Sequence, residues 1–160
     1  MILVALGTQD LPFDRLLAQG DKLVEEGVIQ EEVLAQTGFS TYRPRHYVGK
    51  SMMTFTEFDQ LLGACRFLIA HGGTGTLVGA LKKGKKVIAV PRLKKYGEHV
   101  DDHQTEIIGA LAEAGMLLRV DEMEDLAAAV RSIEDFEPKP YVSTKHNLLE
   151  LLRNFVENIP

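Results

Sequence analysis

The sequence has little cysteine, since Cys65 is the only one among its 160 residues. One cysteine cannot form an intramolecular disulfide, and it cannot supply a cysteine-rich zinc site. A chain of this length can bury a substantial hydrophobic core without such cross-links. We therefore expect a domain that is stabilised by the packing of its apolar residues, which make up 45% of the chain.

Long apolar runs and an excess of positive charge are missing as well. The apolar run at residues 1–6 ends at Gly7 and has no basic flank, and no later window is longer or more apolar. Such a run is too short for a signal peptide or a membrane-spanning helix. The formal net charge of −5 argues against general nucleic-acid binding, because a phosphate backbone attracts positively charged surfaces. We expect a soluble, cytoplasmic protein.

Short apolar runs alternate with amphipathic stretches over residues 1–133. The runs predict strands, and the amphipathic stretches predict helices. This alternation is typical of βαβ units, so it predicts an α/β fold with a Rossmann-like parallel sheet and helices on both faces. The predicted strands are 1–6, 33–36, one beginning at 47–48, 66–70, 87–90 and 117–120, and the predicted helices are 12–24, 55–62, 76–83, 102–114 and 123–133.

The pattern changes after residue 133, where two prolines interrupt residues 134–141. We therefore divide the chain into a ligand-binding domain, 1–133, and a proline-containing linker with a C-terminal amphipathic helix, 134–160. Apolar residues share one face of that predicted helix, namely Leu148, Leu152, Phe155 and Ile159. The face either packs back on the sheet of this chain or docks onto another domain or chain.

Three segments follow predicted strands and are rich in residues that bind ligands: 7–9, 71–76 and 91–104. In an open parallel sheet, ligands bind at the carboxyl ends of the strands. The glycine-rich segment 71–76 gives the strongest signal, because glycines let a backbone approach a ligand and a helix N-terminus attracts an anion such as a diphosphate. Thr74, Thr76 and His71 add hydrogen-bond donors. The alternative is a tight turn that needs glycine only for its backbone dihedral angles.

Two common nucleotide motifs do not fit the glycine-rich segment. No Lys-Ser/Thr pair follows the glycines, as a Walker loop requires. Gly73, Gly75 and Gly79 have the wrong spacing for a dinucleotide fingerprint, and the next strand ends in Pro91-Arg92 instead of an acid for the ribose. An NAD-dependent oxidoreductase is therefore weakly supported.

The segment 97–104 concentrates titratable residues. His99 and His103 are four residues apart, so we expect them to share a helical face as a zinc-binding pair would. However, Val100 stands where a metalloprotease motif has its glutamate, and no third ligand is evident. The other interpretation is that Asp102, His103 and Gln104 form hydrogen bonds with a polyhydroxylated ligand. We expect no bound metal.

Taken in order, these motifs resemble the C-terminal, donor-binding domain of glycosyltransferase family 28, over residues 2–133. The motifs are Gly7-Thr8-Gln9, the 71–76 turn, 87–91 and Asp102-His103-Gln104. LGT-x-x-x-PF-x-RL at 6–16, PR at 91–92 and GEH at 97–99 look closest to PssE-like bacterial subunits of exopolysaccharide and capsule synthesis. Those subunits are similar to the catalytic subunit of the eukaryotic two-subunit UDP-GlcNAc transferase. The resemblance implies a single GT-B-type C-terminal half-domain.

The resemblance also implies a UDP-sugar donor and the residues that contact it. Those expected at the nucleotide and diphosphate are Gly7, Thr8, Gln9, Met53, Phe55, His71, Gly72, Gly73, Thr74, Gly75 and Thr76. Met53 and Phe55 belong to the 51–55 segment, which is expected to contact the uracil. Those expected at the donor sugar are Arg92, Glu98, His99, Asp102, His103 and Gln104. Gly79 stands where related domains carry an acid for the ribose, so Glu98 is a candidate substitute. No metal or other cofactor is implied, and helix dipoles and hydroxyl groups would stabilise the departing UDP.

The family resemblance covers the donor half of a two-domain enzyme. It implies a hexosyltransferase subunit that needs a membrane-anchored, acceptor-binding partner and transfers sugar to a lipid-diphosphate-linked acceptor. The complex would work at the inner face of the plasma membrane, and a homo-oligomer remains open. The alternative is a non-catalytic subunit that stabilises such a partner. We assign no catalytic base, and His99 and His103 are the only candidates.

Overall fold

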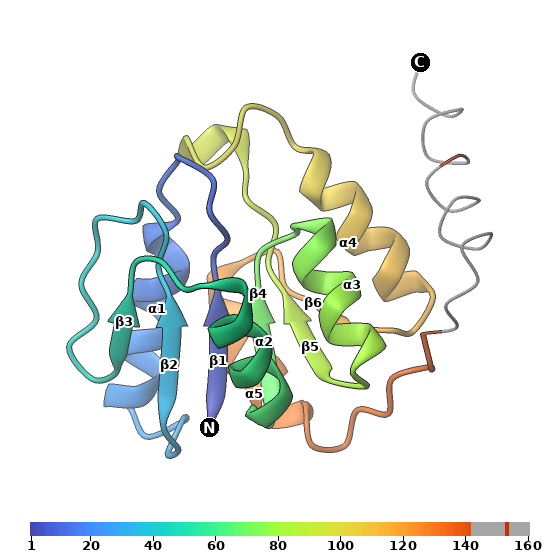
Figure 1. Cartoon of the computed structure of the whole chain (residues 1–160), viewed down its shortest axis with the longest axis horizontal. Coiled ribbons are helices and arrows are strands. Elements are labelled where there is room, and N and C mark those ends of the chain that lie inside the picture. Colours follow the sequence, from blue (N-terminus) through green and yellow to red (C-terminus); the bar gives the residue numbers. More distant parts are fainter. Residues whose placement is uncertain (142–152, 154–160) are drawn as a thin grey trace.

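The computed structural model of the chain describes residues 1–141 and residue 153. Six parallel strands form one sheet in the order β3-β2-β1-β4-β5-β6 (Figure 1). The strands are β1 (Ile2–Ala5), β2 (Val33–Gln36), β3 (Val48–Lys50), β4 (Phe67–Ala70), β5 (Lys86–Ala89) and β6 (Leu118–Arg119). Each overlaps a strand predicted from the sequence, which confirms the α/β class and the parallel sheet.

Helices cover both faces of the sheet, as predicted. In Figure 1, α2 (Phe55–Ala64), α3 (Thr74–Lys82) and α4 (His103–Glu113) lie in front, and α1 (Asp14–Glu25) and α5 (Leu126–Ser132) lie behind. Two short 3-10 helices, η1 (Lys94–Tyr96) and η2 (Met123–Asp125), complete the described elements.

Most helix ends differ slightly from the predicted ones, and two of these differences change the interpretation. The helix α3 begins at Thr74, two residues before the predicted start, so the glycine-rich segment itself supplies the first helical turn. Residues 123–133, predicted as one helix, form η2 and then α5. Both differences lie at helix ends, where pattern-based prediction is least reliable because apolar periodicity does not mark the cap.

The strands have continuous apolar sequences because both of their faces are buried. Successive side chains of a strand point to opposite faces, so Ile2 and Val4 pack in the core under α1 and α5, whereas Leu3 and Ala5 pack in the core under α2, α3 and α4. All four are at most 4% exposed. The absence of polar alternation in the sequence therefore follows from the two helical layers.

The sheet has a topological switch point between β1 and β4. From β1 the chain moves to β2 and β3 on one side, and from β4 it moves to β5 and β6 on the other. The connections after β1 and β4 thus leave the sheet in opposite directions, which opens a crevice at the carboxyl ends of these two strands. This is the edge of the sheet at which the sequence predicts ligand binding.

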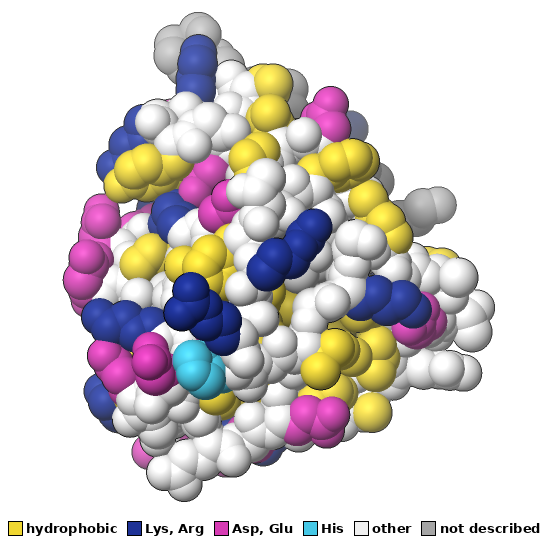
Figure 2. Space-filling view, turned by 90° about the vertical axis from the view of Figure 1, so that its left-hand side faces the viewer, with side chains coloured by type: hydrophobic (Ala, Val, Ile, Leu, Met, Phe, Trp, Pro, Cys, Tyr) yellow, Lys and Arg dark blue, Asp and Glu magenta, His cyan; other side chains and the backbone are white. Residues whose placement is uncertain are grey.

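The outer strand β3 is an exposed sheet edge. All three of its residues are exposed, and Val48 retains 62% of its surface. Figure 2 faces this side of the molecule and shows Lys, Arg, Asp and Glu side chains spread between separate hydrophobic groups. Lys50 of β3 is paired with Glu57 at 2.6 Å. Charged side chains at a short edge strand discourage pairing with another sheet.

Residues 133–141 contain no helix or strand. The division of the chain at residue 134 stays a prediction. The predicted C-terminal helix with Leu148, Leu152, Phe155 and Ile159 lies outside the described residues. Among the helices that the structure describes, none is long and apolar enough to cross a membrane.

The long connection between β2 and β3 is held against α1 by carboxylates. Asp21 of α1 is buried and accepts hydrogen bonds from the Tyr42 hydroxyl (2.7 Å) and from the backbone N–H groups of Arg45 and His46 (3.0 and 2.8 Å). Burial alone would raise the pKa of Asp21, but the hydrogen bonds from Arg45, Tyr42 and His46 outweigh it and lower the pKa below its ordinary value. The folded state therefore favours the ionised carboxylate.

We predict that Asp21→Ala lowers the free energy of unfolding by about 2–4 kcal/mol at pH 7, because several partly buried donors lose their acceptor. Tyr42→Phe removes only one of these bonds, so a loss of about 1 kcal/mol is expected. Urea unfolding measures both. Because the folded-state pKa of Asp21 is lowered, its contribution is complete above its unfolded pKa of about 4 and disappears as the pH falls through the folded value. Equal losses for the two variants, or an Asp21→Ala effect that is unchanged at acid pH, would contradict this assignment.

Candidate functional site

A cavity of about 450 Å³ opens at the carboxyl ends of β1, β2 and β4. Its volume lies within the range of about 300–1,000 Å³ that small-molecule sites occupy. The cavity coincides with the switch point of the sheet. Its lining comes from four separate segments and consists of Gly7, Thr8, Gln36, Met53, Thr54, Phe55, Phe58, His71, Gly73, Gly75 and Thr76.

One side of the cavity is the N-terminus of α3. The cap residue Gly73 has no side chain that could accept a hydrogen bond, and Gly75 and Thr76 of the first turn line the cavity. The first N–H groups of a helix have no carbonyl partner within the helix, and the helix dipole concentrates positive charge there. This wall is therefore suited to an anion, as the sequence predicted.

The glycines of the turn are required by space and not by dihedral angles. Gly72, Gly73 and Gly75 have no positive φ, so the alternative that the turn needs glycine only for its dihedral angles is wrong. A Cβ at Gly72 would lie 2.6 Å from Cβ of Gln104, and one at Gly73 would lie 2.2 Å from Cε1 of His71. A Cβ at Gly75 would meet nothing within 4 Å. The first two glycines make room for neighbouring side chains, and the third leaves the backbone open towards the cavity.

The imidazole of His71 fills the space between the loops after β1 and β4. Gly7, in the β1 loop, has a φ of +76°, and a Cβ there would lie 2.5 Å from Nε2 of His71. The His71 backbone N–H donates to the carbonyl of Ala5 at 3.0 Å, which continues the β1–β4 pairing beyond the strands. The His71 ring is thus packed between two loops that depart in opposite directions.

His71 is neutral under physiological conditions. Burial lowers its pKa to about 3, and the positive charge of Arg92 and the proximity of His99 lower it in the same direction. Among the described residues, Nε2 of His71 has no hydrogen-bond partner. An unpaired buried polar atom costs free energy that a ligand atom could recover.

Another part of the cavity lining is apolar. Met53, Phe55 and Phe58 line it, and Phe55 is 85% exposed. No Asp, Glu, Lys or Arg side chain is among the lining residues. The cavity therefore offers an apolar wall for a ring and a wall of backbone N–H and hydroxyl groups for an anion.

The structure gathers most residues that were predicted at the nucleotide and diphosphate. Those that line the cavity are Gly7, Thr8, Met53, Phe55, His71, Gly73, Gly75 and Thr76. Gln9 and Gly72 belong to the same loops and Thr74 is the first residue of α3, but none of the three is part of the lining. That these residues contact a nucleotide stays a prediction.

Two residues that were predicted at the sugar are buried supports of the neighbouring loop. Arg92 has no exposed surface and donates to the carbonyl oxygens of Leu6 (2.7 Å), Leu11 (2.8 Å) and Glu98 (3.0 Å). The Glu98 carboxylate is paired with Nε of Arg15 at 2.6 Å. Neither Arg92 nor Glu98 lines the cavity.

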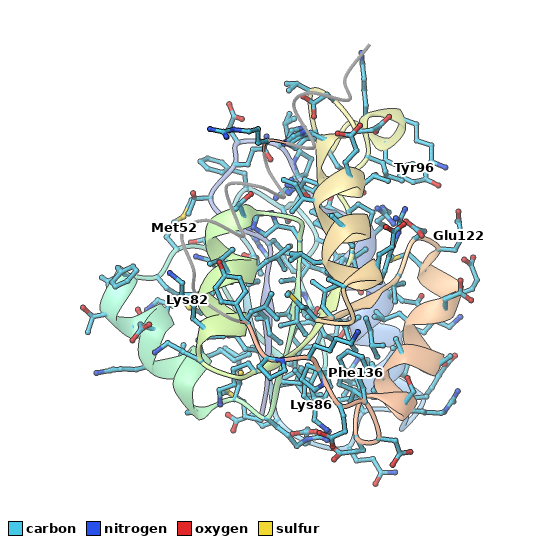
Figure 3. The ribbon with its side chains drawn as sticks, turned by 90° about the vertical axis from the view of Figure 1, so that its right-hand side faces the viewer. Met52, Lys82, Lys86, Tyr96, Glu122 and Phe136 are labelled. Atoms are coloured by element: carbon cyan, nitrogen blue, oxygen red, sulfur yellow. The ribbon has the colours of Figure 1, made fainter. Side chains whose placement is uncertain are left out.

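The same loop reaches α1 through stacking. The Arg15 guanidinium lies 4.9 Å from the ring centre of Tyr96 in η1. Figure 3 shows Tyr96 with η1 at the upper end of the molecule, far from Lys86 and Phe136 at the opposite end. The loop 91–102 is therefore fixed at the carboxyl edge of the sheet.

The predicted shared helical face of His99 and His103 is wrong. His103 is the first residue of α4, whereas His99 lies in the preceding loop, so helical periodicity does not relate them. Nδ1 of His99 lies 3.0 Å from Asp101, Nδ1 of His103 lies 3.6 Å from Glu106, and Asp102 accepts from the backbone N–H of Lys94 (2.9 Å). Within the described part of the chain, no group of three or more His, Cys, Asp or Glu side chains is placed to hold a metal ion.

Sequence analysis missed two lining residues, Gln36 and Phe58, and it included Thr54 only as part of the 51–55 segment. Gln36 ends β2 next to β1, so its position at a strand end was a usable signal. Thr54 caps α2 by accepting the backbone N–H of Glu57, and Phe58 follows one helical turn later. The predicted 51–55 segment thus lies at the cavity, but the sequence did not indicate that α2 turns toward it.

The sequence matches the model of the glycosyltransferase family 28 C-terminal domain over residues 1–159. Among curated proteins, none matches the chain in sequence.

Solved structures show the same fold at low sequence identity. The solution structure of ALG13 has a TM-score of 0.60 and 17% identity, and the match covers 94% of each chain. The glycosyltransferase SnogD from Streptomyces nogalater has a TM-score of 0.60 and 20% identity, with 99% of this chain and 40% of SnogD covered. The calicheamicin glycosyltransferase CalG4 has a TM-score of 0.55 and 15% identity, with 98% and 38% covered. This chain thus spans less than half the length of SnogD and CalG4.

We predict opposite effects for two alanine substitutions that are two residues apart. Gly73→Ala places a Cβ against the buried His71 ring, so it is expected to lower the free energy of unfolding by about 1–3 kcal/mol. Gly75→Ala enters open space in a helical turn, so stability should stay constant or rise by up to about 1 kcal/mol. Urea unfolding of the two variants at pH 7 tests this. Similar destabilisation by both would show that the turn needs its glycines for another reason.

Proposed function

Because this chain belongs to the glycosyltransferase family 28 C-terminal domains, we propose that it binds a UDP-sugar donor in the cavity at β1 and β4. The observation that carries the proposal is Gly75. A Cβ at Gly75 would clash with no neighbouring residue in the described structure, so packing does not explain this glycine. Without a Cβ, however, Gly75 leaves the backbone of the first turn of α3 exposed to the cavity. A glycine at such a position lets a phosphate approach the backbone N–H groups closely.

The diphosphate would lie against the glycine-rich turn. The backbone N–H groups of the first turn of α3 and the hydroxyls of Thr76 and Thr8 are the donors on that side. Since no charged side chain lines the cavity, the helix dipole and these neutral donors would stabilise the negative charge of the departing UDP. The proposed reaction does not use a bound metal.

The uracil would pack on the apolar wall. Met53, Phe55 and Phe58 are the large side chains there, and aromatic faces accommodate a planar ring. Glu98, the candidate for the ribose, is buried in its pair with Arg15. We propose Gln36 instead, because this residue lines the cavity at the end of β2.

The donor sugar would extend toward the start of α4. Gln104 touches the glycine-rich turn through Gly72, so His99, Asp102 and His103 just before it are near the expected position of the sugar. Arg92 and Glu98 are buried within the loop 91–102. They would stabilise the conformation of this loop and would not contact the sugar. His99 and His103 remain the candidates for a catalytic base.

We also propose that activity needs a second, membrane-anchored chain that supplies the acceptor site, with a lipid-diphosphate-linked acceptor. The matching family model describes a C-terminal domain, and SnogD and CalG4 contain more than twice the matched length. The proposed reaction transfers a hexose or hexose derivative in polysaccharide synthesis. Membrane attachment would come through the partner.

Titration calorimetry with UDP tests the binding site. We expect binding that EDTA does not change. Thr76→Ala should weaken it roughly tenfold, the effect of losing one hydrogen bond to a charged group. Ser132→Ala on α5, away from the cavity, should leave the affinity unchanged. Equal affinities of wild type and Thr76→Ala would show that the diphosphate lies elsewhere.

Reconstitution tests the partner. The chain alone is expected to bind UDP but to transfer little sugar, and co-expression with its acceptor-binding partner should raise transfer to a lipid-linked acceptor. If neither the chain nor the complex binds UDP at millimolar concentration, the enzymatic proposal fails and the non-catalytic stabilising role replaces it. Binding of NAD in place of UDP would instead indicate an oxidoreductase.

A further inference from the structure

The amide of Gln104 connects the loops after β4 and β5. Gln104 is the second residue of α4 and is 5% exposed. Its Oε1 accepts the backbone N–H of Gly72 at 2.9 Å and that of Arg92 at 3.1 Å. Both partners are backbone N–H groups, which can only donate. The orientation of the amide is therefore fixed, because the flipped amide would place its NH₂ group against two donors.

The fixed amide determines which nitrogen of His71 carries the proton. Because Oε1 of Gln104 accepts the two backbone N–H groups, its Nε2 faces Nδ1 of His71 at 3.2 Å. An amide NH₂ only donates, so Nδ1 must accept. A neutral imidazole has one N–H, which then resides on Nε2. This atom is buried, lacks a partner among the described residues and lies between Gly7 and Gly73.

We propose that Gln104 is a positioning residue that holds His71 as the Nε2–H tautomer, so that a neutral N–H donor faces the ligand between the two loops. This inference deepens the proposed function, because the expected acceptor is a diphosphate oxygen of the UDP-sugar. The opposite tautomer would present a lone pair to that oxygen, and attraction would become repulsion. A hydrogen bond to an ionised acceptor is among the strong ones.

Nitrogen-15 NMR of the ligand-free protein, labelled at histidine, measures the tautomer directly. In the wild type we expect Nε2 of His71 to be protonated and Nδ1 to be unprotonated between pH 5 and pH 8. Detection of the Nδ1–H tautomer, or of rapid exchange between the two forms, would overturn the proposal whatever the protein binds.

Gln104→Glu separates this role from simple support of the loops. A carboxylate can still accept the N–H groups of Gly72 and Arg92 on one oxygen, but its other oxygen must accept from His71. We expect His71 to become protonated at Nδ1 while the amide signals of Gly72 and Arg92 keep their hydrogen-bonded positions. In Gln104→Met, the new side chain has no amide donor or acceptor. We expect His71 to lose its preference for the Nε2–H tautomer and the backbone amide signals of Gly72 and Arg92 to shift. An unchanged His71 spectrum in Gln104→Glu would refute the assignment.

Calorimetry with UDP links the tautomer to binding. Gln104→Glu should weaken UDP binding at least tenfold in the wild-type background and by much less in a His71→Gln background, where no tautomer can change. An equal loss of UDP affinity in both backgrounds would mean that the negative charge of Glu at position 104 repels UDP by itself. That result would refute the positioning role of Gln104. If the wild type has the Nε2–H tautomer but binds no UDP, the positioning role stands and the proposed donor is wrong.

Discussion

The loops at the carboxyl edge of the sheet depend on one buried charge, the guanidinium of Arg92. It has no exposed surface, and its donors reach the carbonyl oxygens of Leu6, Leu11 and Glu98. A buried charge without such partners destabilises a fold by several kcal/mol, so these contacts constrain all three backbone segments at once. One of the segments leads directly into Gly7 and Thr8 of the cavity. The position of the candidate site thus follows from how this cation is satisfied in the interior.

The candidate site favours an anion without using a charged side chain. Its donors are the first turn of α3, threonine hydroxyls and a neutral His71, and its glycines are small so that side chains and ligand can come close. Neutral, fixed donors need little reorganisation when negative charge develops nearby, which suits a reaction whose leaving group is a diphosphate. Because Gln104 and Gly7 hold His71 from two sides, the site depends on packing between loops that are distant in sequence.

The fold was predictable because its signals are local. Each strand is a short apolar run, and the alternation with helices requires a parallel sheet. The gathering of segments 7–8 and 71–76 also followed, since strand ends in such a sheet meet at one edge. Segment 53–55 was expected beside them only because of the family resemblance. The arrangement of segment 91–104 did not follow. Arg92 and Glu98 are polar and were expected at a ligand, but both side chains are buried, Arg92 against the carbonyls of Leu6 and Leu11 and Glu98 against Arg15. The predicted helical relation of His99 and His103 failed because α4 begins only at His103.

The sequence by itself determined the α/β class, the glycine-rich turn after a buried strand and the family of the chain, because periodicity and motif order are properties of the chain alone. Only the tertiary structure decided why the glycines are there and what the polar residues do. Gly72 leaves room for the side chain of Gln104, which lies 32 residues away, and Gly73 leaves room for the ring of His71, which lies 2 residues away. Burial and hydrogen-bond partners depend on contacts between distant segments, and no local pattern encodes whether an Arg, a Glu or a Gln will face a ligand or the interior.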